Sequence, residues 1–307
     1  MKKSEQSKKS RSKKHHYLPR YYLKGFTDSR NYFFVYDKQK DRILPNALTP
    51  DTFFFENNLN TVILPNGTYS DFLEDSYTEF EVQTRGSLDT IRNSNIKTPI
   101  QLIDMMHLFL FLLFLHWRLP SNIKYVEELS KKFFVADYKD LNCFTIKNKN
   151  GKTASKEIID KIKNSTAFKK TSKLIIPFAP FYDGRWGERL KNWRFLYTGD
   201  ENNWHLVGDN PIITKGNSDH DPVNCLKEFV FPVSGKILLV NIGNPISKDF
   251  PPELVLQFNI SIIERAQRFV ACQNKDFLEA LIKFYKLHIW FKKTDTIIPE
   301  MFNIFKK

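Results

Sequence analysis

The most apolar part of the chain lies in TPIQLIDMMHLFLFLLFLHWR, residues 98–118. Thr98 to Gln101 has the pattern of a capping box with proline at the first helical position, so the sequence predicts a helix from Thr98 to Arg118. From Leu108 to Leu115 this helix is apolar on every side, and such a helix must be covered by other elements. Histidines interrupt the apolar run, which is shorter than the ~20 residues that a bilayer span needs. The sequence therefore predicts a central buried helix.

The rest of the chain shows helical and strand periodicity in turn. Further helices are predicted to begin at Ser70, Ser121 and Ser155 and to span 252–271 and 276–285. Strands are predicted at 32–37, 60–64, 193–197, 204–207, 211–214, 229–233 and 237–242. The predicted class is α+β, with the central helix in a helical bundle and two small, mainly antiparallel sheets. Residues 1–14 are predicted to form a disordered basic arm, and residues 15–307 a single intertwined α+β domain.

Charge and cysteine usage set the expected environment. The net charge is +13, and seven Lys and Arg residues lie within the first fourteen positions. Such an excess favours polyanions, so nucleic acid is the predicted partner, with a protein partner left open. The three cysteines are far apart, which indicates neither a disulfide framework nor a zinc ribbon, and no apolar segment of a signal peptide follows the basic residues. We expect a cytoplasmic protein without membrane association.

The segment HHYLPRYYLKGF, residues 15–26, is the densest group of reactive side chains. A neutral imidazole of His15 or His16 can accept a proton or ligate a metal, and Arg20 can bind phosphate together with Lys13 and Lys14. The alternative is structural. In that interpretation His15 belongs to the basic arm, and His16 is a packed residue with a backbone partner.

Carboxylates on the helix that begins at Ser70 are the candidate partners of these histidines. Glu74 and Glu81 are seven residues apart and therefore lie on one face, with Asp75 and Glu79 beside them. They could hold a divalent ion together with His16 or act as acid and base. The alternative is a solvated acidic face, which is the more common outcome.

A second candidate group is Gly208-Asp209-Asn210-Pro211, which lies between two predicted strands. Asp209 could serve there as a base or a ligand, with Asn210 held in an extended conformation by the following proline. The same residues also satisfy the geometry of a turn without any chemical role.

Four separated stretches together resemble the domain-of-unknown-function family 4238, whose mostly bacterial members carry an N-terminal HHYxPxxYLxxF motif. The stretches are His15 to Phe26, Phe114 to Pro120, Gly208 to Pro211, and Asn259 with Ala266 to Val270. The family usually has Gln and Arg-Thr-Pro in the second stretch and Ser-Asp-Asn-Pro in the third, where this chain has His116-Trp117-Arg118-Leu119-Pro120 and Gly208. The resemblance implies that His15, His16, Arg118, Asp209 and Asn210 converge on one composite site.

Imidazole, guanidinium and carboxylate groups on a basic protein suit a phosphodiester. We therefore expect a nucleic-acid-directed enzyme, a nuclease that acts as a toxin or an antiphage defence effector and uses a divalent metal. The alternative is a non-catalytic nucleic-acid- or protein-binding module of a defence or regulatory complex. The expected catalytic residues are His15, His16, Asp209 and Asn210, and the expected phosphate-binding residues are Lys13, Lys14, Arg20 and Arg118.

Overall fold

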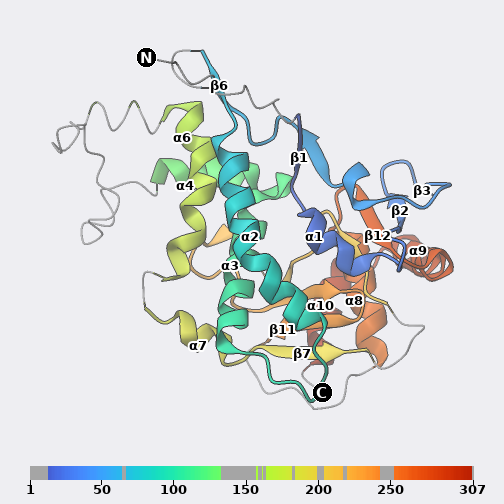
Figure 1. Cartoon of the computed structure of the whole chain (residues 1–307). Helices are drawn as coiled ribbons and strands as arrows, with labels where there is room; N and C mark the ends of the chain where they lie inside the picture. The colour runs from blue at the N-terminus through green and yellow to red at the C-terminus, as the bar shows by residue number, and fades with distance from the viewer. Residues whose placement is uncertain are drawn as a thin grey trace.

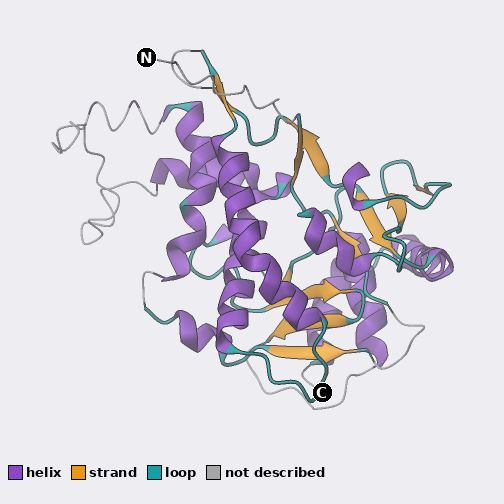
Figure 2. Cartoon of the chain, viewed as in Figure 1, coloured by secondary structure: helices purple, strands orange, loops and turns teal. Residues whose placement is uncertain are grey.

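A computed structural model gives the fold of the chain (Figure 1). It describes residues 13–63, 67–132, 164–181, 184–198, 204–216, 220–242 and 252–305, together with the single residues 157 and 161. The predicted arm lies outside these residues except for Lys13 and Lys14, and most of the predicted helix that begins at Ser155 lies outside them as well. One group of helices lies on the left side of the view, whereas most strands lie to the right of it together with the remaining helices (Figure 2).

The helical side is built around α3, Leu102–Arg118, which lies beside α2, Phe72–Arg92 (Figure 1). From Leu108 to Arg118 every α3 side chain except that of Leu110 is buried. The apolar pattern predicted this burial, because a helix that is apolar on every side is stable only when other elements cover all of its faces. The same side holds α4, Ile123–Lys132, and α6, Thr166–Thr171.

The predicted start of the central helix is wrong by four residues. The Thr98 N–H donates to the Asn95 carbonyl at 2.9 Å, and the Thr98 hydroxyl accepts from the Asn95 N–H at 3.4 Å. Thr98 therefore closes a turn with the residues before it, and α3 begins only at Leu102, after Gln101 in extended conformation. A local turn and a helix cap compete for the same short polar side chain, and here the turn prevails.

All strand pairs of the described residues are antiparallel, which confirms the α+β class. One four-stranded sheet has the order β7-β11-β10-β9 and a second has the order β3-β2-β12-β8, whereas two further sheets have only two strands each. The first sheet consists of Arg194–Tyr197, Ile237–Asn241, Phe229–Ser234 and Ile213–Thr214. The second consists of Arg42–Ile43, Phe34–Asp37, Phe269–Cys272 and Val207–Gly208. The two-stranded sheets pair β1, Lys14–His16, with β4, Phe55–Asn57, and β5, Val62–Ile63, with β6, Tyr69–Ser70.

Two predicted elements of the C-terminal half are assigned differently in the structure. The strand predicted at 204–207 appears only as β8, Val207–Gly208, which pairs with β12, whereas β9, within the predicted 211–214, pairs with β10 in the other four-stranded sheet. The helix expected over 252–271 ends earlier, as α8, Pro252–Arg265, and β12 follows it. The Lys38 ammonium donates to the carbonyls of Ile263, Glu264 and Ala266, so the end of α8 is satisfied by a side chain and the chain can turn into the sheet.

Short and long helices complete the description. The N-terminal motif contains α1, Arg20–Leu23, and the chain also includes α7, Trp186–Leu190, α9, Lys275–Trp290, and α10, Thr294–Ile304. Within the described ranges no single helix is long and apolar enough to cross a membrane. One bent pair, Leu102–Arg118 with Pro120–Lys131, has the length and composition, and its first helix is mostly buried in the molecule.

Candidate functional site

The N-terminal motif is anchored by its aromatic residues and by one arginine. Tyr21 and Tyr22 are buried, and their hydroxyls bond the Thr84 hydroxyl and the Pro232 carbonyl, each at 2.9 Å. Arg92 of α2 donates to the carbonyls of both tyrosines, at 2.8 Å and 2.5 Å. These contacts join α1 to α2 and to β10, so the motif has a fixed position beside the helical side.

The two histidines of the motif point to opposite sides of β1, as neighbours on a strand do. His15 is fully buried, its Nδ1 accepts the Asn60 N–H at 2.8 Å, and it lies 3.9 Å from the Glu74 carboxylate. Asn60 in turn donates its side-chain amide to Glu74 at 2.8 Å. His15 is therefore part of an internal polar network and does not line the pocket described next.

His16 lies in the wall of a pocket of about 410 Å³. Burial, together with the positive charges of Arg20 and Arg118, lowers the pKa of His16 to about 4, so its ring is neutral at pH 7. The ring packs against Phe55, with 5.4 Å between centroids. Among the residues that the structure describes, its buried Nε2 has no hydrogen-bond partner, which is an unusual and costly state for a polar atom.

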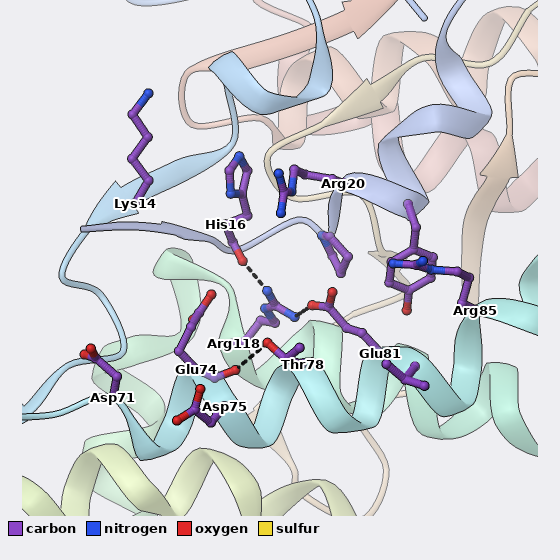
Figure 3. A pocket seen from close by; sticks show the side chains of 13 residues that line it. Lys14, His16, Arg20, Asp71, Glu74, Asp75, Thr78, Glu81, Arg85 and Arg118 are labelled. Atoms are coloured by element: carbon purple, nitrogen blue, oxygen red, sulfur yellow. Dashed lines mark hydrogen bonds and ion pairs between the residues drawn. The ribbon is translucent and has the colours of Figure 1, made fainter. Parts of the chain in front are cut away.

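The pocket has one basic and one acidic wall (Figure 3). β1 and α1 contribute basic side chains next to His16, and α2 contributes a row of carboxylates opposite them. The lining residues are Lys14, His16, Pro19, Arg20, Tyr21, Asp71, Glu74, Asp75, Thr78, Glu81, Val82, Arg85 and Arg118. Arg20 and Arg85 are exposed cations at this pocket; Arg20 pairs with Asp51 at 2.7 Å, and Arg85 lies over the Tyr21 ring.

Arg118 also reaches the pocket, but its guanidinium is engaged inside the protein. It is buried, pairs with Glu81 at 2.7 Å, donates to the His16 carbonyl, and lies over the Tyr77 ring. The negative charge of Glu81 raises the pKa of Arg118 despite the cost of burial. The expectation that Arg118 binds phosphate is therefore corrected: this side chain holds α3, α2 and β1 together.

The predicted metal site is not formed in the structure. Glu81 is paired with Arg118 and Glu74 with Asn60, so both carboxylates are engaged by protein partners. Among the residues that the structure describes, no group of three or more His, Cys, Asp and Glu side chains could hold a metal. Glu74 and Glu81 do share one face of α2, as their spacing predicted, and this face forms the acidic wall.

Asp209 and Asn210 do not line the pocket. Both are buried, and the Asp209 carboxylate accepts the backbone N–H groups of Gln267, Arg268 and Phe269 at 2.8, 2.7 and 2.9 Å. These bonds fasten the β8 turn to the start of β12, although burial still raises the pKa of Asp209. The composite site is therefore corrected: His16, Arg118, Arg20 and Lys14 come together, whereas Asp209 and Asn210 have a structural position elsewhere.

Four further polar residues line the pocket, Asp71, Asp75, Thr78 and Arg85, and of these only Asp75 was considered from the sequence, as a neighbour of Glu74 and Glu81. They are spaced by three, four and seven residues and share the polar face of α2 with Glu74 and Glu81. The same helical period that identified the buried face of α2 could have identified them. Polar residues that recur every three or four positions share one face of a helix, opposite the face that packs on the core.

No curated protein and no solved structure matches this chain. A family model does, and it covers residues 14–276, from β1 to the start of α9. It includes the histidine motif, the pocket with both its walls, and the Asp209 turn. The model's description is a protein of unknown function (DUF4238), and the chain belongs to this family.

Proposed function

We propose that the protein is a nucleic-acid-directed enzyme that hydrolyses a phosphodiester in the pocket between β1, α1 and α2, with His16 as the general base. The observation that supports this most strongly is His16 itself. Its ring is neutral at pH 7, its Nε2 has no partner within the described part of the chain, and it lies in the pocket wall beside exposed cations. An uncharged imidazole with a spare lone pair is the form that accepts a proton.

The charge distribution determines how such a substrate would be placed. Lys14 and Arg20 are exposed next to His16, whereas the α2 wall has four carboxylates against one arginine, Arg85, and repels phosphate. A phosphate group would therefore lie on the β1 and α1 side. The carboxylates of Asp71 and Asp75 would face hydroxyl or amino groups of the nucleotide, which are hydrogen-bond donors.

Binding of a phosphate would change the environment of His16. Arg20 is paired with Asp51 in the free protein, and Figure 3 shows its side chain beside the His16 ring. A phosphate that replaces Asp51 as the partner of Arg20 would place a phosphodiester beside the His16 ring. Water then attacks phosphorus while Nε2 takes its proton, a P–O bond forms to the water oxygen, the ester P–O bond breaks, and the leaving oxygen takes a proton from solvent.

The test uses the purified full chain with labelled single-stranded RNA and DNA, with Mg²⁺ or Mn²⁺ and with a chelator. Cleavage is expected for the wild type, and His16→Gln should reduce its rate by about 10²-fold or more, the usual contribution of a general base. His288→Gln, on α9 and outside the pocket, is the matched control and should cleave normally. Cleavage by His16→Gln at the wild-type rate would exclude His16 as the base.

A second candidate function is a binding module without hydrolysis. It is favoured by the engagement of His15, Arg118 and Asp209 in internal contacts, which leaves mainly the exposed cations for a ligand. It predicts salt-dependent binding without product in any metal condition, and a weaker salt dependence for Arg20→Gln. The predicted role as a toxin or antiphage effector depends on hydrolysis, and comparing the growth of cells that express the wild type or His16→Gln would test it.

A further inference from the structure

A smaller pocket of about 170 Å³ lies between α4, α6 and the loop after β4. α4 and α6 pack against each other on the helical side (Figure 1). The pocket is lined by Asn58, Leu59, Ile123, Val126, Glu127, Lys169, Lys170 and Lys173. Three of these eight residues are lysines, against a single carboxylate, so the pocket carries a positive charge of its own.

Lys173 is the unusual residue of this pocket. It lies in the 3-10 turn Ser172–Leu174 directly after α6, and only 3% of it is exposed. Within the described residues its ammonium group forms no hydrogen bond or ion pair, and the pocket is the space that it borders. Because so little of the residue is exposed, its ammonium group can take a partner only from the pocket, and lysines are rarely buried to this extent without one.

The neighbouring lysines add to the cost of burying this ammonium group. Lys170 donates to the Thr61 carbonyl at 2.9 Å, which holds its positive charge at the pocket. Burial and the charges of Lys170 and Arg118 lower the pKa of Lys173 to about 8, against the opposing effect of Glu56 and Glu127. An anion in the pocket would relieve the repulsion and supply the missing hydrogen-bond acceptor in one step.

We propose that this pocket binds a small oxyanion, a phosphate or carboxylate group on a short apolar body, through Lys173 together with Lys169 and Lys170. The apolar part of the ligand would contact Leu59, Ile123 and Val126, which form the other wall. The volume corresponds to about five or six water molecules at ~30 Å³ each, so only a small molecule or a terminal group fits. This proposal is independent of the nuclease proposal, because it involves different side chains.

The experiment measures thermal unfolding and calorimetric binding with sodium phosphate and with sodium butyrate, each against sodium chloride of equal ionic strength. One or both anions should raise the unfolding temperature of the wild type above the chloride value. In Lys173→Met, which keeps the length of the side chain without its charge, affinity should fall at least tenfold. Lys131→Met, an exposed lysine of α4 outside the pocket, should bind as the wild type does.

Two further variants keep the test decisive if Lys173→Met does not fold by circular dichroism. Val126→Phe should block the pocket and Lys169→Met should weaken anion binding several-fold. The proposal is overturned if neither anion acts beyond chloride or if the pocket variants bind as the wild type does. It is also overturned if Arg20→Gln, at the larger pocket, is the variant that loses the response.

Discussion

The guanidinium of Arg118 forms an ion pair with the Glu81 carboxylate at 2.7 Å, and only 4% of the arginine side chain is exposed. The pair joins the end of α3 to the middle of α2, and the same arginine reaches the His16 carbonyl of β1. It therefore fixes the floor of the larger pocket, where the sequence had suggested a ligand-binding arginine.

Glu81→Gln should destabilise the fold by about 3–5 kcal/mol, because it leaves the Arg118 charge buried without its counterion. Urea unfolding gives the free energy of unfolding directly. Glu79→Gln, an exposed carboxylate on the same helix, should change it by less than about 0.5 kcal/mol. Equal effects of the two substitutions would show that the ion pair does not hold the pocket floor.

Asp209→Asn should cost about 2–3 kcal/mol of stability and leave nucleic-acid binding unchanged. The amide offers one acceptor oxygen and a competing N–H₂ group where the carboxylate receives three backbone N–H groups, so at least one buried donor loses its partner. Urea unfolding and binding to labelled RNA measure the two effects separately. Asp276→Asn, in the exposed first turn of α9, is the control, and a specific loss of RNA binding in Asp209→Asn would place Asp209 in the site.

The pH dependence of His16 follows from its lowered pKa. Between about 4 in the folded protein and 6.5, the value for an unperturbed histidine, the unfolded chain binds more protons than the folded one. The free energy of unfolding should therefore rise with pH across this window, and part of that rise should be absent in His16→Gln and present in His288→Gln. Proton NMR should give a His16 midpoint near 4. A midpoint above 7 would mean that the ring is mostly charged at pH 7 and would contradict the proposed neutral base.

Lys173 should produce a similar effect at alkaline pH. Lys173 loses its proton near pH 8 in the folded protein but only near pH 10.5 in the unfolded chain. The free energy of unfolding should therefore rise with pH between these two values. At pH 7 Lys173→Met should unfold at a higher temperature than the wild type, and the gap should narrow as the pH approaches 10. Lys131→Met provides the reference. A difference in unfolding temperature that stays constant with pH would mean that the charge of Lys173 does not destabilise the folded protein.

Alanine substitutions at Gly25 and at Gly86 form a matched pair. A Cβ atom on Gly25 would lie 2.6 Å from the Arg92 guanidinium, which bonds the carbonyls of Tyr21 and Tyr22, whereas a Cβ atom on Gly86 of α2 meets open space. Gly25→Ala should cost about 1–3 kcal/mol through this clash. Gly86→Ala should stabilise its helix by about 0.5–1 kcal/mol. Thermal unfolding compares them, and a neutral Gly25→Ala would show that Arg92 can move without loss.

The central helix and the acidic face of α2 were predictable because both depend on periodicity within one segment. The roles of Arg118 and Asp209 were not. Arg118 finds its counterion 37 positions away, and Asp209 finds its three N–H donors 58 to 60 positions away. A sequence pattern shows that a polar side chain is present, but only the packing decides whether a distant partner occupies it or leaves it for a ligand.

β12 was missed for a related reason. Phe269 to Ala271 were included in the helix predicted over 252–271, because four apolar residues are too few to separate a strand from a helix end. The segment is a strand because β2 and β8 pair with it on either side. Tertiary pairing overrides local preference in such short apolar segments.

The pairing of β2 with β12 also bears on how the protein is made. Val35 lies opposite Ala271, so the sheet beside the histidine motif needs a strand that is synthesised more than two hundred residues later. During translation the N-terminal half therefore emerges while one edge of β2 still lacks its final neighbour. Contacts between residues so far apart in the sequence form slowly. A polypeptide interrupted before residue 269 would carry the residues of the larger pocket without the strand that completes the adjoining sheet.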